Sequence, residues 1–367
     1  MGILQPIWDG TFVYREPVCF SADKDGRPTG GTLLYQPEEI LSVTSFDGSV
    51  FYQPVRDYTA NRRQLVRTEA SRIPYLERSV YCKPFTGVPE TAWVRLSGGK
   101  AYMEVVSDVY RWQTLVTYTH RDKWAGFQPK TCGESLPRSM EKLRAGGDFH
   151  LTLYGDSITA GWEASGCNER AIDMVTLGEY HVSLWHAPYQ PAWAELVTNA
   201  LQARYPQSNV IKTNRAAGGS TVQWGVEHAA ELVPPCKPDL IMLGFGMNSM
   251  QESAEDYRRA ILSIIRTIRK ECHDCEFVLM SPMIPNPEIK GFQNNQLPAQ
   301  QDVLYQIAAE LEGVCIAPVH SVFREMTARG KHYLELTGNC INHPNDFSVR
   351  VYAQTVLRTL GVDGSDG

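Results

Sequence analysis

Hydrophobic and polar positions alternate in short segments over residues 1 to about 145. Turn sequences such as Asp23–Gly26, Asp47-Gly48 and Ser97–Gly99 separate these segments. The pattern predicts strands at Thr11–Tyr14, Thr32–Tyr35, Ile40–Val43, Ser49–Val55, Trp93–Leu96, Ala101–Val106 and Gln113–Tyr118. Because no sustained helical period interrupts them, we expect an N-terminal β-sandwich of the jelly-roll kind.

The pattern changes after a connector at residues 128–147, which holds one short helix. Apolar strands then alternate with amphipathic helices, a pattern typical of a parallel sheet covered on both faces. The predicted strands are Phe149–Tyr154, Val210–Thr213, Leu240–Phe245, Phe277–Ser281 and Val314–Pro318. The predicted helices lie around Trp193–Leu201, Tyr257–Ile268 and Val303–Leu311, the last ended by Gly313. We therefore expect two domains, residues 1–145 and 146–367, the second a three-layer α/β/α fold with a five-stranded sheet.

The first strand of this second half leads directly into Tyr154-Gly-Asp-Ser-Ile-Thr-Ala-Gly161. A serine that follows a buried strand and opens a helix can present its hydroxyl and its backbone N–H at the edge of the sheet. Ser157 is thus a candidate nucleophile. The alternative is structural, because Asp156 or Ser157 could equally cap the N-terminus of that helix.

Three further polar segments follow strands or precede the last helix. They are Asn214-Arg-Ala-Ala-Gly-Gly-Ser-Thr221, Gly244-Phe-Gly-Met-Asn-Ser249 and Gly338-Asn-Cys-Ile-Asn-His-Pro-Asn-Asp346. Parallel strands end at one edge of the sheet, so these segments should converge on Ser157. Together they would supply a nucleophile, N–H donors for an oxyanion and a histidine base.

These four motifs, in this order over residues 149–361, resemble the SGNH hydrolase superfamily, also called the GDSL esterases. The resemblance implies that Ser157 is the nucleophile and His343 the general base. It also implies an oxyanion hole formed by the N–H groups of Ser157 and Gly219 and the side-chain amide of Asn248. The stretches Asn286-Pro287, Thr337–Asn339 and His343–Asp346 are similar to those of two-domain bacterial carbohydrate O-acetylesterases, in which a β-sandwich precedes the hydrolase domain.

The chain departs from that family at one position. The family places an aspartate three residues before the histidine, and this chain has Cys340 there. A backbone carbonyl in residues 340–342, an oxygen of Asn339 or Asn342, or Asp346 could orient His343 instead. Asp346 is better explained as the cap of the last helix. Some acetylesterases of the superfamily are similar in working with a Ser–His pair alone.

Other residues near these motifs are candidates for binding substrate. Trp162, Glu163 and Trp224 could line an acyl or sugar subsite, although packing is the simpler explanation for Trp224. The segment Ser165–Trp185 lacks strong periodicity and could form a loop beside the site. Cys272-His-Asp-Cys275 has no second pair at metal-ligand spacing, so we expect thiols at a helix–strand junction.

Composition and charge limit the partners of the chain. Its formal net charge is −6 over 367 residues, without runs of Lys or Arg, which argues against nucleic acid or an anionic membrane. No stretch approaches the roughly 18 apolar residues of a membrane span. Asp9, Arg15 and Glu16 interrupt the N-terminus, so we expect a cytoplasmic protein, or a secreted one if a leader has been removed. We expect no metal or organic cofactor, and a homo-oligomer is left open.

The combined prediction is a serine esterase that removes acetyl groups from O-acetylated oligo- or polysaccharides. An esterase or lysophospholipase for lipid-like acyl esters is the first alternative. The second is a carbohydrate-binding protein without catalysis, which the missing aspartate keeps open. Both alternatives predict a different response to acyl-chain length or to loss of Ser157.

Overall fold

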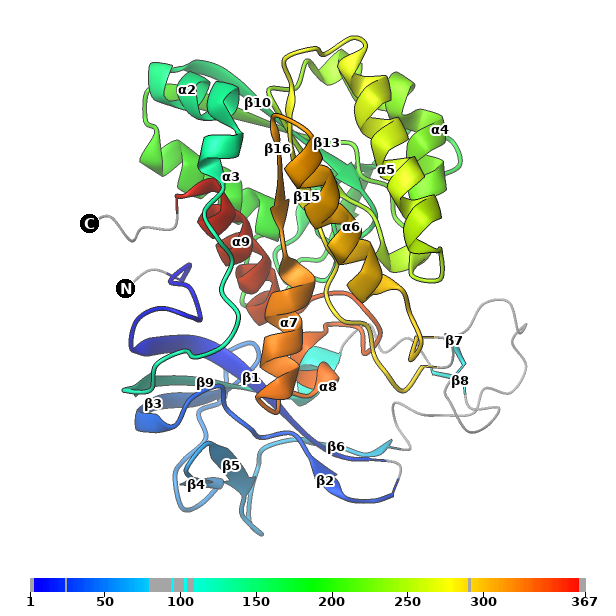
Figure 1. Cartoon of the computed structure of the whole chain (residues 1–367). Coiled ribbons are helices and arrows are strands. Elements are labelled where there is room, and N and C mark those ends of the chain that lie inside the picture. The colour runs from blue at the N-terminus through cyan, green and yellow to red at the C-terminus, as the bar shows by residue number, and fades with distance from the viewer. Residues whose placement is uncertain are drawn as a thin grey trace.

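The computed structural model describes residues 3–23, 25–78, 94–95, 102–103, 109–289 and 292–362. An N-terminal β domain packs below a larger domain of helices and parallel strands (Figure 1). Its sheet has the order β2-β1-β9-β3, formed by Pro28–Thr29, Phe12–Ala22, Gln113–His120 and Pro37–Ser45. These neighbours are antiparallel, whereas β6 (Tyr75–Leu76) runs parallel to β1. The N-terminal β domain, which the sequence predicted as a jelly-roll-like β-sandwich, is thus confirmed as a domain built on an antiparallel sheet.

Two of the expected N-terminal strands are absent from the described part of the domain. Thr32–Tyr35 and Ser49–Val55 make only isolated bridges. The N–H groups of Leu34 and Tyr35 donate to the side chains of Glu16 and Tyr118 instead of to a neighbouring strand. Both strand predictions were wrong, and in Thr32–Tyr35 these side-chain acceptors take the place of a neighbouring strand.

The sheet also has a small companion hairpin that the pattern did not predict, β4 (Tyr58–Asn61) with β5 (Gln64–Arg67). Two further expected strands, Trp93–Leu96 and Ala101–Val106, fall mostly outside the described residues. Within them Val94–Arg95 (β7) pairs with Tyr102–Met103 (β8). The 3-10 helix η2 (Val109–Trp112) then leads into β9.

The larger domain contains the expected five-stranded parallel sheet. Its order is β13-β10-β14-β15-β16. The chain forms β10 first, adds β13 on one side of it at the sheet edge, and then adds β14, β15 and β16 on the other side. The strands are Gly147–Gly155 (β10), Ser208–Asn214 (β13), Leu240–Gly244 (β14), Glu276–Met280 (β15) and Val314–Ala317 (β16). All four pairings are parallel. The predicted strands are therefore confirmed, with ends that differ by at most two residues.

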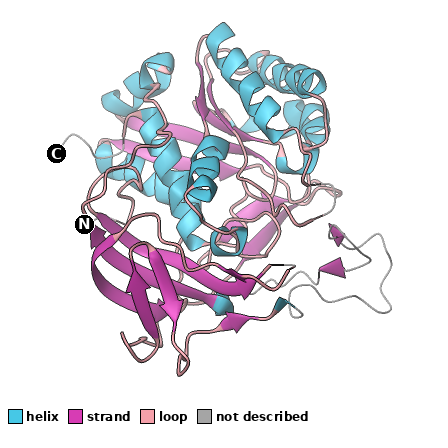
Figure 2. Ribbon diagram, turned by 60° about the horizontal axis from the view of Figure 1, so that its bottom comes forward, coloured by secondary structure: helices cyan, strands magenta, loops and turns pink. Residues whose placement is uncertain are grey.

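Alternate side chains of these strands enter two different cores. Leu151, Leu153, Met242 and Val278 pack in one core and Tyr154, Ile241, Leu243 and Phe277 in the other, as period-two alternation requires. On the first face lie α2 (Pro137–Ala145), α3 (Trp193–Arg204), α7 (Val319–Ala328) and α9 (Asp346–Leu360). On the second lie α4 (Val222–Leu232), α5 (Ala254–Arg269) and α6 (Leu297–Glu310). The three-layer α/β/α arrangement is thus confirmed (Figure 2).

The first of these cores continues into the β domain without interruption. Val18, Tyr35 and Tyr118 of the β domain belong to the same buried cluster as Tyr352 and Leu357 of α9. The connector holds the 3-10 helix η3 (Gly133–Ser135) and α2, whose Met140 and Leu143 pack against the larger domain. The other short helices in the described part of the chain are η4 (Pro234–Cys236), η5 (Met247–Ser249) and α8 (Tyr333–Leu336).

Candidate active site

Ser157 lies two residues beyond the end of β10. Residues 156–163 form successive turns and not the helix that the sequence predicted, and the chain proceeds to β11 (Asn168–Ile172). Asp156 stabilises the first turn, because its Oδ1 accepts the N–H of Ile158 at 3.0 Å and of Thr159 at 3.4 Å. Burial raises the pKa of the Asp156 carboxyl to about 6. Capping thus belongs to Asp156, and the Ser157 hydroxyl is available for another partner.

That partner is His343, from the segment between α8 and α9. The distance between Ser157 Oγ and His343 Nε2 is 2.8 Å, a hydrogen-bonding distance. Both residues are largely buried, with exposed fractions of 5% and 9%. The structure therefore brings together the two residues for which the sequence predicted nucleophile and base.

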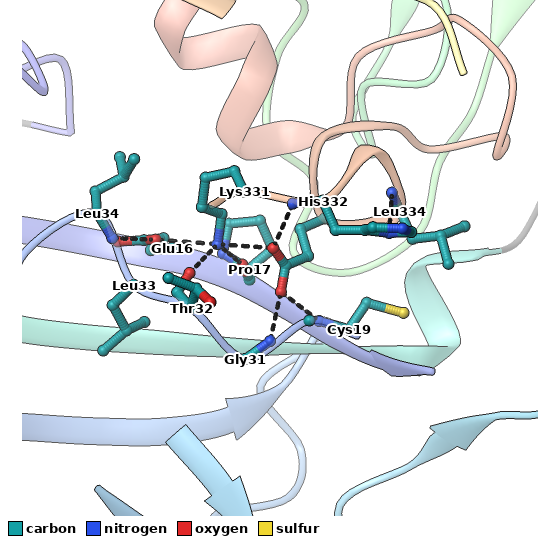
Figure 3. A network of polar contacts seen from close by, with 12 residues as sticks. Glu16, Pro17, Cys19, Gly31, Thr32, Leu33, Leu34, Lys331, His332 and Leu334 are labelled. Atoms are coloured by element: carbon teal, nitrogen blue, oxygen red, sulfur yellow. Dashed lines mark hydrogen bonds and ion pairs between the residues drawn. The ribbon is translucent and has the colours of Figure 1, made fainter. Parts of the chain in front are cut away.

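The segment that carries His343 is held by the β domain. Lys331, just before α8, is fully buried and its Nζ lies 3.0 Å from Glu16 Oε1 and 3.3 Å from Glu335 Oε2. The same ammonium donates to the carbonyls of Pro17 and Thr32 (Figure 3). Burial lowers the pKa of Lys331 and the two carboxylates raise it, and the net direction is upward. We call Glu16, Lys331 and Glu335 the buried charge cluster.

Two further contacts complete the attachment of this segment. Glu335 Oε1 accepts the N–H groups of Cys19 and Gly31, which belong to the β domain (Figure 3). Gln113 at the start of β9 donates to the carbonyls of Leu334 and Thr337, both at 2.8 Å. The position of His343 thus depends on side chains more than 200 residues away in the sequence.

The predicted oxyanion donors lie on the loops after β13 and β14. Gly219 has a φ of +81°, a conformation that favours glycine, and its N–H has no acceptor among the described residues. The N–H of Ser157 likewise has none there. The amide of Asn248 is fixed by donating one hydrogen to the carbonyl of Ser220 at 3.0 Å, which leaves its second hydrogen available. Gly219 and Asn248 are both exposed, so these donors face solvent.

The segment Ser165–Trp185 contains a hairpin that the sequence did not predict. Strands β11 and β12 (Glu179–Ser183) pair in antiparallel fashion, and Glu169 of β11 forms an ion pair with Lys212 of β13. The end of β11 bridges Ala217, next to the glycine loop. At the hairpin tip Met174 Sδ lies 3.9 Å from the place that a Cβ on Gly219 would occupy. The hairpin therefore forms a wall beside Gly219, and Met174 is a site residue that the sequence did not reveal.

The three candidate substrate-binding residues occupy different surroundings. The Trp162 ring lies edge-on to His343, with 5.6 Å between ring centroids, and also packs against Gly218. Glu163 Oε1 lies 3.7 Å from His343 Nδ1. Trp224 is 9% exposed, packs against Tyr154 and donates its indole N–H to the carbonyl of Met174. A role of these residues in binding substrate stays a prediction.

Asp346 and the backbone carbonyls do not orient His343. Asp346 accepts the N–H and the hydroxyl of Ser165, and burial raises the pKa of its carboxyl. The helix cap is Asn345, whose side chain accepts the N–H of Ser348, so assigning the cap to Asp346 was wrong. The carbonyls of Cys340 and Ile341 accept hydrogen bonds from Asn286. Asn339 does contact His343 Nδ1, at 3.0 Å, but through its Nδ2 atom.

The Cys272-His-Asp-Cys275 motif lies outside this site. Cys272 and Cys275 lie in the turn between α5 and β15, where the Cys275 N–H donates to the Cys272 carbonyl. No group of three or more His, Cys, Asp or Glu in the described residues is arranged to hold a metal ion. Within the same residues, no helix has the length and apolar character needed to cross a membrane.

The chain matches the model of the GDSL-like lipase/acylhydrolase family over residues 153–348, which include all four predicted catalytic and oxyanion positions. The match spans more than half of the chain, so the protein belongs to this family of ester hydrolases. No curated protein matches the chain.

Solved structures are similar to this chain in fold. One is a two-domain esterase (CEX) active on acetylated mannans, co-crystallised with mannopentaose, at 20% identity and a TM-score of 0.48. The alignment covers 65% of this chain but only 55% of that one. Another is Axe2, an acetylxylan esterase from Geobacillus stearothermophilus, at 20% identity, a TM-score of 0.46, and coverage of 59% and 96%. A third, LAE5 from the Lake Arreo metagenome, has 20% identity, a TM-score of 0.45, and coverage of 61% and 100%.

Proposed function

We propose that this protein is a serine esterase that removes acetyl groups from O-acetylated oligo- or polysaccharides through an acyl-enzyme intermediate. The observation that carries the proposal is the 2.8 Å contact between Ser157 Oγ and His343 Nε2 beside two loops that offer N–H donors. Membership of an acylhydrolase family supports ester hydrolysis.

The mechanism follows from the positions of these groups. Ser157 Oγ attacks the ester carbonyl carbon while its proton passes to His343 Nε2. The N–H groups of Ser157 and Gly219 and the Asn248 amide stabilise the oxyanion of the tetrahedral intermediate. His343 then gives the proton to the leaving sugar oxygen, and water releases acetate from Ser157 by the same sequence of steps.

Three features support an acetyl ester of a bulky, hydrated alcohol such as a glycan. Gly219 and Asn248 are exposed, so a glycan can approach the oxyanion donors directly from solvent. The motifs around His343 are also similar to those of two-domain acetylesterases. The Trp162 indole, next to His343, offers the kind of aromatic surface on which sugar rings pack.

One observation favours the alternative of a lipid-like acyl ester. Met174 and Val175 at the tip of the β11–β12 hairpin are exposed apolar residues, and Met174 lies next to Gly219. Such a surface could accept a longer acyl chain. This alternative predicts that activity rises with chain length.

A series of nitrophenyl esters of increasing acyl length tests the proposal. We expect the acetyl ester to be preferred by the wild type, and turnover to fall to background in Ser157→Ala. A preference for long acyl chains would favour the lipid ester, and full activity in Ser157→Ala would overturn the serine mechanism. Mass spectrometry of acetyl loss from acetylated xylan and mannan fragments then identifies the glycan.

A further inference from the structure

The amide of Asn339 has only one orientation that its surroundings allow. Its Oδ1 accepts the backbone N–H groups of Ile341, Asn342 and His343 at 2.9, 3.0 and 3.1 Å. A flipped amide would turn its NH₂ group toward these three donors, which would leave them unsatisfied. Nδ2 must therefore be the atom that faces His343 Nδ1 at 3.0 Å.

This orientation conflicts with the task of a general base. To accept the proton of Ser157 at Nε2, the imidazole must carry its own proton at Nδ1. Asn339 Nδ2 can only donate, so its contact stabilises the tautomer that has no proton at Nδ1. The active tautomer and the imidazolium both need a hydrogen-bond acceptor near Nδ1.

Among the described residues, Glu163 is the carboxylate that lies within ion-pair distance of His343 Nδ1. Its Oε1 is 3.7 Å from His343 Nδ1, and its side chain is 13% exposed. No hydrogen bond to its carboxylate occurs among the described residues, so His343 is its one polar partner there. A carboxylate removed from water in this way is stabilised by a positive partner, which the imidazolium provides.

The loop that carries His343 is shaped to admit Glu163. A Cβ on Gly338 would lie 2.9 Å from Glu163 Cβ and 3.4 Å from its Oε2. Gly338 in turn donates its N–H to the carbonyl of His343 at 2.9 Å. Glu163 has a φ of +71°, an uncommon conformation for a residue with a side chain, and it directs the carboxylate into this gap. Gly338 on the histidine loop and the backbone conformation of Glu163 thus both bring the carboxylate close to His343.

We propose that Glu163 is the positioning carboxylate of His343 and replaces the aspartate that the family carries at the position of Cys340. The inference rests on the proposed function. Cys340 itself packs in a buried apolar cluster with Cys19, Leu76 and Val109. Glu163 accepts the Nδ1–H of His343, an approach of about 1 Å from the observed distance, and stabilises the imidazolium formed when the Ser157 proton reaches Nε2.

Asn339 provides a sharp test, because aspartate has the same shape. In Asn339→Asp, one oxygen keeps the three backbone donors and the other replaces Nδ2 beside Nδ1. We expect Glu163→Gln to lower kcat for the acetyl ester by roughly 10²-fold with little change in KM. Adding Asn339→Asp should then restore kcat to within about tenfold of the wild type. The exposed Glu134→Gln is the matched control and should leave both constants unchanged.

Nitrogen-15 spectra of the His343 ring give a readout that does not depend on turnover. We expect the proton at Nδ1 in the wild type and at Nε2 in Glu163→Gln. An unchanged kcat, a rise in KM alone, absence of rescue by Asn339→Asp, or the same tautomer in both proteins would overturn the inference. If Ser157→Ala is inactive while Glu163→Gln is fully active, only this inference fails and the proposed function stands.

Discussion

At the scale of single residues, the adjacent Asp156 and Ser157 have different roles. Asp156 caps the turn through the N–H groups of Ile158 and Thr159 and leaves the hydroxyl of Ser157 to His343. The sequence offered capping and catalysis as alternatives for the same stretch. The structure accommodates both, because a carboxylate is an acceptor only, whereas a hydroxyl can also donate its proton.

Replacing the oxyanion donor Asn248 with alanine should lower kcat by roughly 10²–10³-fold, because one donor contributes about 2.7–4 kcal/mol to the transition state. KM for nitrophenyl acetate should change little, since the oxyanion exists only during the reaction. Asn209→Ala is the control, because Asn209 is exposed and its side chain donates to Asp148 on the surface. A kcat within threefold of the wild type would remove Asn248 from the oxyanion hole.

The sequence could single out Ser157, Gly219 and Asn248 because each lies in a motif after a strand, and His343 because its motif precedes the last helix. It could not predict which residue faces His343 Nδ1. That depends on how the Asn339 amide is fixed by three backbone donors and on the conformation of Glu163, which are tertiary features. Met174 was missed for the same reason, because no local pattern marks a hairpin tip as a neighbour of Gly219.

At the scale of elements, the segment from Lys331 to Asn345 is the part of the site that the β domain holds in place. The buried charge cluster attaches its beginning to β1, and Gln113 of β9 attaches α8 and also accepts from Asn345. The parallel strands could be predicted because they are continuous apolar runs. This segment could not, because its stability comes from the other domain.

Substituting Lys331 with methionine should lower the free energy of unfolding by about 3–5 kcal/mol, because Glu16 and Glu335 would remain buried without their cation. Chemical unfolding measures this loss, and kcat should also fall because the His343 segment loosens. Lys123→Met, at an exposed lysine, should change neither quantity. A loss below about 1 kcal/mol would show that the cluster does not hold the segment.

At the scale of the whole molecule, one core joins the β domain to the first face of the parallel sheet. The sequence predicts a domain boundary near residue 145, because the spacing of hydrophobic residues changes there. It could not show that β1, β9 and α9 share buried side chains, since such contacts join segments far apart in the chain. The β domain therefore supports the active site in addition to any role in binding glycan.

Stability should also depend on pH through His320, which is 3% exposed. Burial lowers its pKa to about 4, so the unfolded chain, with an ordinary value of 6.5, takes up the proton first. The free energy of unfolding should therefore fall by about 3 kcal/mol more in the wild type than in His320→Gln as the pH drops from 6.5 to 4. Asp156 acts in the opposite direction, because its stabilising protonated form is lost as pH rises toward 6. Equal slopes in the two proteins would contradict this assignment.

In the proposed mechanism, Ser157 is activated by His343 and carries the acyl group during turnover. Rapid acid quench with nitrophenyl acetate, followed by peptide mass spectrometry, tests it most directly. We expect one acetyl group on the peptide that contains Ser157, absent from Ser157→Ala and strongly reduced in His343→Ala. Acetyl found on another residue, or hydrolysis that proceeds in Ser157→Ala at the wild-type rate, would contradict it.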